Sequence, residues 1–187
     1  MLLNKDKSQV LIVDVQERLV PVMNNAELLV RNCEVLAQSA SELGIPITVS
    51  EHYSKGLGPT VDRLNDAINS SEENAFVMEK LHFSCAADPD ILFHVASLAE
   101  NGRRQLIIAG VESHVCVLQS ALGFKQAGLD VYVAIDATSS RDKNSKSVAK
   151  DRLNNSSITV VTLEMIVFEW LHVSGTSEFK KLSQLVK

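Results

Sequence analysis

The fold is decided by the stretch Gln105-Leu-Ile-Ile-Ala-Gly-Val-Glu-Ser-His-Val-Cys116-Val117, which predicts a buried strand, a sharp turn and the start of a helix. Residues 106–109 form a short apolar run, Gly110 interrupts it, and Ser113 is a candidate N-cap for the segment that follows. Cys116 then lies in the first helical turn, where unpaired N–H groups and the helix dipole favour a thiolate. Cys116 is therefore a candidate nucleophile, although a small apolar residue that packs the helix onto the sheet would fit the same pattern.

Similar short apolar runs recur along the chain and predict six strands. Strands that are almost wholly apolar are those covered on both faces, so the sheet is expected to be mainly parallel. The six predicted strands cover residues 9–13, 45–50, 75–78, 105–109, 131–135 and 158–161.

Segments with helical spacing separate these strands. The clearest has apolar residues every three or four positions from Leu29 to Leu43 and ends at Gly44. The chain therefore predicts a three-layer α/β/α sandwich, Rossmann-like, with residues 1–187 forming a single domain. Further helices are expected at 60–68, 90–100, 113–127, 145–153, 162–172 and from 177 onward, and the polar stretch 65–74 is expected to be a connecting loop.

Composition narrows the class of protein. Hydrophobic residues make up 45% and charged residues 22%, as in ordinary globular proteins, and the net charge of −5 offers no basic surface for nucleic acid. No apolar run approaches the ~18 residues of a membrane span, and residues 1–7 are too short and too charged for a signal peptide. We expect a cytoplasmic protein with no membrane partner. Its three cysteines have no Cys-x-x-Cys spacing, which predicts reduced thiols.

Ionisable side chains follow three of the predicted strands. Ligands of open parallel sheets bind beyond the carboxyl ends of the strands, where Asp14, Lys80 and Cys116 would lie. Singly, Asp14 fits a capping or turn residue and Lys80 a solvated loop residue. Together, a lysine that lowers the thiol pKa and a carboxylate that takes the thiol proton make the nucleophile and base of acyl transfer.

Three segments resemble the isochorismatase-like cysteine hydrolases in order and spacing. They are Leu11-Ile-Val-Asp14-Val-Gln16, Glu79-Lys80 followed by Phe83-Ser84, and Ala109-Gly-Val-Glu-Ser-His-Val-Cys116-Val117. The resemblance covers nearly the whole chain, and residues 55–60 and 136–141 look like the small single-domain branch rather than the nicotinamidases.

The resemblance implies a catalytic triad in which Cys116 is the nucleophile, Asp14 the base and Lys80 the stabilising cation. It also implies a cis peptide at Val111-Glu112, which would direct the N–H groups of Glu112 and Cys116 into an oxyanion hole. The expected reaction is the hydrolysis of a small amide-type C–N bond through a thioester, with no cofactor.

Other residues are expected around this site. The resemblance implies that Gln16 lies beside it, supporting the triad or contacting the substrate. Leu19, Tyr53 and Phe83 suggest an apolar lining suited to a small planar or aliphatic amide. His114 lies two positions from Cys116 and would not face it on a helix, so it is expected at the pocket mouth rather than as the base.

A metal ion is not expected. Nicotinamidases bind one through an aspartate and histidines after the second strand, whereas this chain has Glu51-His52-Tyr53 with no second histidine nearby. His52 is therefore interpreted as a loop or rim residue. Because the cysteine is present, whereas enzymes that cleave isochorismate can lack it, the family name does not indicate the substrate.

Several features have more than one interpretation. Residues 55–60 are expected to form a rim loop because they lack the ending of a phosphate-binding loop. Cys85 could border the pocket or be structural, Asp136 is expected in a turn or cap, and Arg141 could meet an anionic substrate or a neighbouring subunit. The segment 165–171 is apolar over more than one helical stripe, which predicts a homo-oligomer.

Two alternative functions stay open from the sequence. One is a catalytically idle interaction module that kept the fold and pocket. The other is a redox-sensing protein, with sulfenic acid or a mixed disulfide forming at Cys116 or Cys85.

Overall fold

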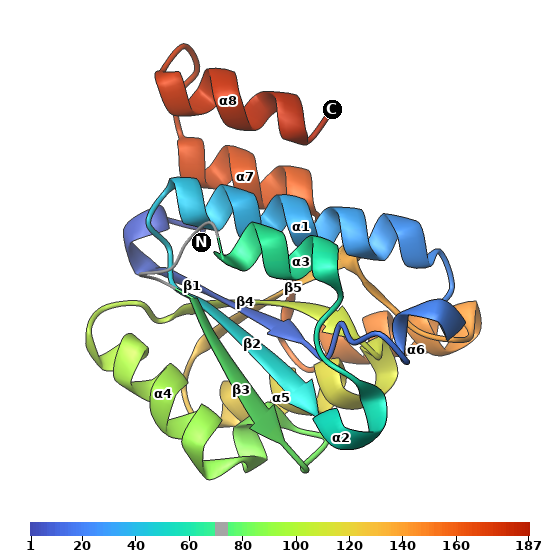
Figure 1. Ribbon diagram of the computed structural model, residues 1–187. Coiled ribbons are helices and arrows are strands. Elements are labelled where there is room, and N and C mark those ends of the chain that lie inside the picture. The colour runs from blue at the N-terminus through green and yellow to red at the C-terminus, as the bar shows by residue number, and fades with distance from the viewer. Residues whose placement is uncertain (70–74) are drawn as a thin grey trace.

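The computed structural model describes residues 1–69 and 75–187 and contains one six-stranded sheet (Figure 1). The strand order is β3-β2-β1-β4-β5-β6, and neighbouring strands are all parallel. This confirms the predicted α/β fold with a six-stranded parallel sheet. The strands are β1 (Ser8–Val13), β2 (Ile47–His52), β3 (Ala75–Lys80), β4 (Gln105–Val111), β5 (Asp130–Ser139) and β6 (Thr159–Val161).

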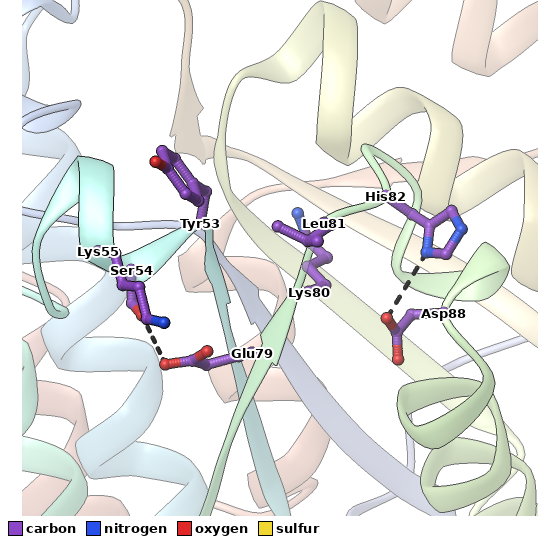
Figure 2. A pocket seen from close by; sticks show the side chains of 8 residues that line it. All are labelled: Tyr53, Ser54, Lys55, Glu79, Lys80, Leu81, His82 and Asp88. Atoms are coloured by element: carbon purple, nitrogen blue, oxygen red, sulfur yellow. Dashed lines mark hydrogen bonds and ion pairs between the residues drawn. The ribbon is translucent and has the colours of Figure 1, made fainter.

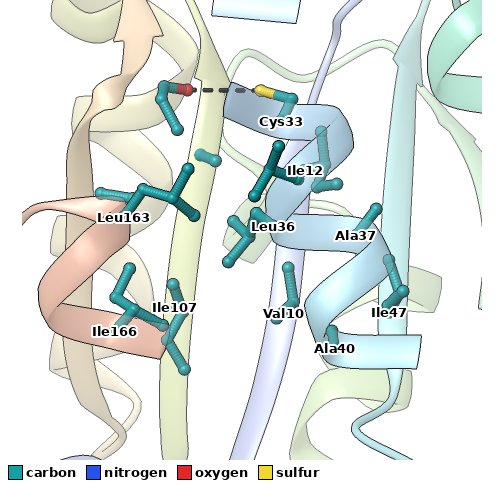
Figure 3. Packing of buried hydrophobic residues seen from close by; sticks show 14 of the residues in the cluster. Val10, Ile12, Cys33, Leu36, Ala37, Ala40, Ile47, Ile107, Leu163 and Ile166 are labelled. Atoms are coloured by element: carbon teal, nitrogen blue, oxygen red, sulfur yellow. Dashed lines mark hydrogen bonds between the residues drawn. The ribbon is translucent and has the colours of Figure 1, made fainter. Parts of the chain in front are cut away.

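Helices cover both faces of the sheet, and each face has its own apolar core. One face packs against α1 (Ala26–Glu42), α3 (Asp62–Asn69) and α7 (Leu163–Leu171), and α8 (Ser177–Leu185) lies outside α7 and α1. The other packs against α4 (Pro89–Glu100), α5 (Leu118–Gln126) and α6 (Lys143–Asn155). Figure 3 shows the first core, where Leu36 and Ala40 of α1 lie over Val10 and Ile12 of β1.

Strands β1 and β4 are central and wholly buried, which explains their unbroken apolar sequence. The chain runs outward from β1 through β2 to β3 and then returns to β4 on the other side of β1. The strand order therefore reverses between β1 and β4. In open α/β sheets this point is where ligand sites form, beyond the carboxyl ends of the strands.

Some sequence-based expectations were wrong in detail. Residues 65–69 belong to α3 rather than to a loop, because Leu64, Ala67 and Ile68 pack into the core, and the rest of the expected loop, 70–74, lies outside the described residues. The rim loop contains a short helix, α2 (Ser54–Leu57). It was not predicted, because Gly56 and Gly58 are typical of loops. Strand β5 runs on to Ser139, so Asp136 lies within it, where its carboxylate accepts the Leu163 N–H at the start of α7.

The start of the helix after β4 also differs from the prediction. Residues Ser113–Val117 form a π-helical turn, η4, and α5 begins only at Leu118. Ser113 is not its N-cap, because the Ser113 hydroxyl donates to Thr138 Oγ1 at 3.0 Å instead. Cys116 therefore lies in a widened turn rather than in a regular α-helix.

The apolar face of α7 is covered within the chain. Helix α8 packs against α7, with the rings of Phe168 and Phe179 6.2 Å apart and Leu182 fully buried. Trp170 is also buried and donates its indole N–H to Ser8 Oγ at 2.9 Å. The tail of the same chain thus covers part of α7, while Met165 and Phe168 stay 46% and 42% exposed.

Candidate active site

The three candidate catalytic residues meet at the reversal point of the sheet. Asp14 directly follows β1, Lys80 ends β3, and Cys116 lies in η4 after β4. A buried ion pair joins the first two, with Lys80 Nζ 2.6 Å from Asp14 Oδ2 and both side chains 0% exposed. The charges of Asp14 and Lys80 act on the thiol of Cys116, the first raising its pKa and the second lowering it.

Backbone geometry fixes Asp14. Its φ of 53° places it in the left-handed region, and its N–H donates to the Ser50 carbonyl at 3.0 Å. The Ser50 hydroxyl donates to Asp14 Oδ1 at 2.7 Å, while Lys80 occupies Oδ2. Both carboxylate oxygens therefore have a donor, as a buried charge requires.

The ion pair keeps Lys80 charged. Burial alone would lower the pKa of Lys80, but the charge of Asp14, with smaller contributions from Cys85 and Cys116, raises this pKa above its ordinary value. The site therefore holds a permanent cation next to the thiol.

The thiol of Cys116 is protonated at rest, contrary to the expectation of a thiolate. Burial, followed by the charge of Asp14, raises the pKa of Cys116 from 9.0 to about 12, and Lys80 offsets only part of this. The helix dipole and Lys80 favour the thiolate, but the loss of water around the sulfur raises the thiol pKa by more. Only 8% of Cys116 is exposed. The resting site thus contains a thiol, a carboxylate and an ammonium.

The turn that carries Cys116 approaches β1 closely. Gly110 has φ of 107°, and a Cβ built on it would lie 2.1 Å from the Val13 carbonyl oxygen. The next peptide, Val111-Glu112, is cis, as the resemblance implied. The Glu112 side chain points away to Arg141, whose backbone N–H and Nε donate to Oε2 at 3.0 and 3.1 Å. Arg141 therefore braces the turn.

Gln16 braces the strand ends. Its Oε1 accepts the His52 N–H at 2.8 Å, and its Nε2 donates to the carbonyls of His52 and Gly58 at 3.1 and 2.7 Å. Since the amide is occupied by backbone groups, Gln16 supports the loop after β2. Leu19 is partly buried and packs against the core that α1 covers, rather than beside Asp14, Lys80 and Cys116.

A cavity of about 410 Å³ lies at the carboxyl end of β3 and includes Lys80 among its lining residues. Figure 2 shows the side chains that line it. Tyr53 and Leu81 supply its apolar surface, and Glu79 accepts a hydrogen bond from the Ser54 hydroxyl. Its lining residues are Tyr53, Ser54, Lys55, Glu79, Lys80, Leu81, His82 and Asp88.

Phe83 and His114 lie at different distances from this cavity. Phe83 is 54% exposed and stacks on the His52 ring, with centroids 5.4 Å apart. His114 instead lines a separate hollow beside α6, and its Nδ1 lies 3.0 Å from Ser140 Oγ. The structure therefore brings Tyr53 and Phe83, but not His114, near the end of β3.

The donor set does not fit a metal ion. In residues 1–69 and 75–187, no three His, Cys, Asp or Glu side chains are grouped as ligands. Burial and the charge of Lys80 lower the pKa of His52, and its ring stacks on that of Phe83. His52 is thus a neutral rim residue.

Two residues near the triad were missed as site residues or left undecided. Ser50 is fully buried and bonds Asp14, and Cys85 lies behind it with Sγ 3.5 Å from Ser50 Oγ. A serine at the end of an apolar strand could have signalled this role, since a buried hydroxyl needs a partner. Cys85 carried no such signal.

A buried carboxylate–ammonium pair and a neighbouring cysteine thus lie at the switch point of a parallel α/β sheet. The Isochorismatase domain family matches residues 8–165, and the chain therefore belongs to the isochorismatase-like hydrolases.

None of the helices in the described ranges combines the length and apolar character of a membrane span.

Individual relatives agree with this family. Isochorismatase family protein 1A of Dictyostelium discoideum is 30% identical over 98% of this chain and 87% of its own length. The structure titled MAR1 ribonuclease, from Caenorhabditis elegans, superposes with a TM-score of 0.90 at 27% identity, covering 100% of this chain and 92% of that one. The Escherichia coli YcaC gene product, described as an octameric hydrolase of unknown specificity, has the same fold, with a TM-score of 0.89 at 23% identity over 99% and 90% of the two chains.

Proposed function

We propose that this protein hydrolyses a small amide-type C–N bond through a thioester on Cys116. The observation that carries the proposal is the buried Asp14–Lys80 ion pair, whose charges act on the Cys116 thiol. We propose that the Asp14 carboxylate takes the thiol proton at the moment of attack, which a protonated thiol requires.

In the acylation step, the thiol proton moves to Asp14 while the sulfur forms a bond to the substrate carbonyl carbon. The C–N bond then breaks, and the departing amine takes the proton from Asp14. Water attacks the thioester in the second step and passes its proton to Asp14. The C–S bond breaks, and the thiol recovers the proton as the acid leaves.

The carbonyl oxygen acquires negative charge in both steps. We propose that the backbone N–H groups of Glu112 and Cys116 bind it. The brace between Glu112 and Arg141 supports this by holding the turn on its far side. Lys80 adds a fixed positive charge nearby.

The cavity supports a small substrate. A volume of about 410 Å³ with Tyr53 and Leu81 on its walls suits a compact planar or aliphatic amide. We propose further that no metal takes part, because the donor groups around His52 do not form a ligand set. Dialysis against EDTA is expected to leave turnover unchanged, and a loss restored by one divalent ion would contradict this.

The alternatives have less support. Redox sensing needs a thiolate, and the pKa of Cys116 is raised to about 12. An idle module would not need an ion pair buried against a thiol. The ribonuclease named among the relatives would bind a phosphate backbone, for which a chain of net charge −5 offers little.

The proposal is tested by screening small amides against the wild type and Cys116→Ala, with Cys33→Ala as the matched control. Cys33 is a buried thiol in the α1 core, away from the triad. Turnover by the wild type and Cys33→Ala, with none by Cys116→Ala and an acyl adduct on Cys116 by mass spectrometry, is expected. Full turnover by Cys116→Ala would exclude nucleophilic catalysis by this residue.

We also propose that residues 1–187 act as one domain in a cytoplasmic homo-oligomer. The single sheet with a core on each face supports one domain, and the octamer described for YcaC supports assembly. Three free thiols fit a reducing compartment. Light scattering is expected to give a multiple of 20.5 kDa, and a mass near 20.5 kDa would count against the oligomer.

A further inference from the structure

A line of hydrogen bonds runs behind Asp14, on residues that the proposed mechanism does not use. Cys85 Sγ donates to Ser50 Oγ at 3.5 Å, and Ser50 Oγ donates to Asp14 Oδ1 at 2.7 Å. The Cys85 N–H donates to Ser120 Oγ at 2.8 Å. All four residues are fully buried.

This line connects the base to the helix that follows the nucleophile. Ser120 lies in α5, directly after the turn that carries Cys116, and Cys85 lies in the short 3-10 helix η3 (Cys85–Ala87), which packs against α5. Gly123 of α5 allows this approach, since a Cβ there would lie 2.7 Å from Ala86 Cβ. Ser120 thus links α5 to Cys85, and Cys85 links η3 to Ser50 at the end of β2.

The bond from Ser50 also fixes the rotation of the carboxylate. The terminal torsion of an aspartate is broad and soft, so a single contact at Oδ2 leaves the group free to turn. With Lys80 at one oxygen and Ser50 at the other, the plane of the carboxylate is set. One orientation then faces the Cys116 thiol.

We propose that Ser50 and Cys85 are positioning residues that hold the Asp14 carboxylate toward the Cys116 thiol. Ser50 acts directly on Asp14, and Cys85 acts through Ser50. For activity this proposal rests on the proposed hydrolase function, but the contacts predict a property of the thiol that needs no substrate.

That property is the reactivity of Cys116. The ionisable groups that act on its thiol are Asp14, Lys80 and Cys85. Asp14 raises the pKa of Cys116, in part through the hydrogen bond that the thiol donates. If Ser50 maintains the orientation for that bond, its loss lowers the thiol pKa and makes alkylation faster.

The test measures the rate at which iodoacetamide labels Cys116 between pH 8 and 10, by mass spectrometry. Cys33 and Cys85 are 0% exposed, so Cys116 reacts first. We expect the rate to rise most in Asp14→Asn and by about three- to tenfold in Ser50→Ala, a fall of up to about one pH unit in the thiol pKa. Ser50→Thr, which keeps the hydroxyl, is expected to stay near the wild-type rate.

A double-mutant cycle separates positioning from a general structural effect. In the Asp14→Asn background, Ser50→Ala is expected to change the rate no further, because its route to the thiol has gone. An unchanged rate in Ser50→Ala, or the same acceleration in both backgrounds, overturns the proposal. If Ser50→Ala does not fold, the Cys85 variants give the test. Cys85→Ala is expected to label slightly faster than the wild type, and Cys85→Ser at the wild-type rate. Equal labelling rates for Cys85→Ala and Cys85→Ser overturn the role of Cys85.

Activity provides the second readout. On a substrate found by the amide screen, Ser50→Ala is expected to lower kcat by about tenfold with KM unchanged, because Asp14 acts in the chemical step. Failure of the hydrolase proposal would be seen as turnover by Cys116→Ala or none by the wild type. Failure of the positioning proposal would be seen in the labelling rates, so the two outcomes are distinct.

Discussion

At the scale of single residues, the site depends on a charge pair that has no contact with water. Asp14 and Lys80 are each stable as ions only because the other is present, with Ser50 as a further donor. The charges of this pair act on the Cys116 thiol, whose pKa burial and Asp14 raise. The chemistry is therefore prepared by burial and pairing rather than by a preformed thiolate.

The first prediction concerns the stability of this pair. Lys80→Met leaves the Asp14 carboxylate buried without its cation and is expected to lower the free energy of unfolding by about 3 kcal/mol. Asp14→Asn combined with Lys80→Met removes both charges and is expected to lie within about 1 kcal/mol of the wild type. Urea denaturation followed by circular dichroism measures both values. A double variant less stable than Lys80→Met would show that the pair is not the cause.

Asp14, Lys80 and Cys116 could be predicted from the sequence because each follows an apolar run that ends at the same edge of the sheet. The pKa of Cys116 could not, since it depends on how completely η4 is covered. The contacts of Ser50 with Asp14 and of Cys85 with Ser50 could not be predicted either, because they come from the pairing of β2 with β1 and from the packing of η3 on α5.

At the scale of elements, the turn after β4 determines where the nucleophile lies. Gly110 allows β4 to pass the carbonyl of Val13, and the π-helical turn η4 then carries Cys116 over the end of β1. The strand and the following helix were predicted from apolar periodicity. The widened turn was not, because its hydrogen bonds depend on Glu112, whose carbonyl accepts the N–H groups of Val115 and Val117.

The second prediction separates two reasons why a position requires glycine, a positive φ and a close approach of neighbouring backbone. Gly110→Ala and Gly102→Ala both place a side chain at positive φ, 107° and 96°, but only the first meets backbone atoms. We expect Gly102→Ala to cost about 1 kcal/mol of unfolding free energy, as backbone strain alone would. Gly110→Ala is expected to cost at least about 3 kcal/mol of unfolding free energy, since β4 must move away from β1. In this background the iodoacetamide labelling rates of Cys116 with and without Ser50→Ala are expected to be equal. Equal costs in thermal or urea unfolding would mean that the close approach is unimportant.

At the scale of the whole molecule, the apolar strands predicted the layers correctly, but not which helices share a face. The tail helix α8 covers α7, a contact that follows from the path of the chain after Leu171 and not from any local pattern. The apolar surface of α7 that α8 leaves exposed is limited to Met165 and Phe168.

The third prediction concerns alkaline stability. Burial raises the pKa of Cys33 and of Cys116 from 9.0 to about 12, and the pKa of Lys80 is also raised, mainly by the charge of Asp14 against the effect of burial. All three groups hold their protons more tightly when folded, so their stabilisation is complete below pH 9 and is lost as the pH rises toward 12. We expect the free energy of unfolding to fall by about 1 kcal/mol per thiol by pH 10.

Cys33→Ala is the matched test of this effect. It is expected to be less stable than the wild type at every pH because of the lost packing, but its decline between pH 8 and 10 should be smaller by the share of one thiol. Urea titrations at pH 7, 8, 9 and 10 give the slopes. Parallel slopes for the two proteins would contradict the assignment of this decline to Cys33.

The protonated thiol of Cys116 also has a consequence for inhibitor design. A simple electrophile in solution meets a sulfur that holds its proton and lies almost out of reach, so raising the intrinsic reactivity of a warhead gains little. A compound that first docks like the substrate would place its electrophilic carbon where Asp14 removes the proton. Selectivity among such compounds would then depend on how well each binds the site before the covalent bond forms. A weakly reactive electrophile would be sufficient, and it would spare thiols of ordinary pKa in other proteins.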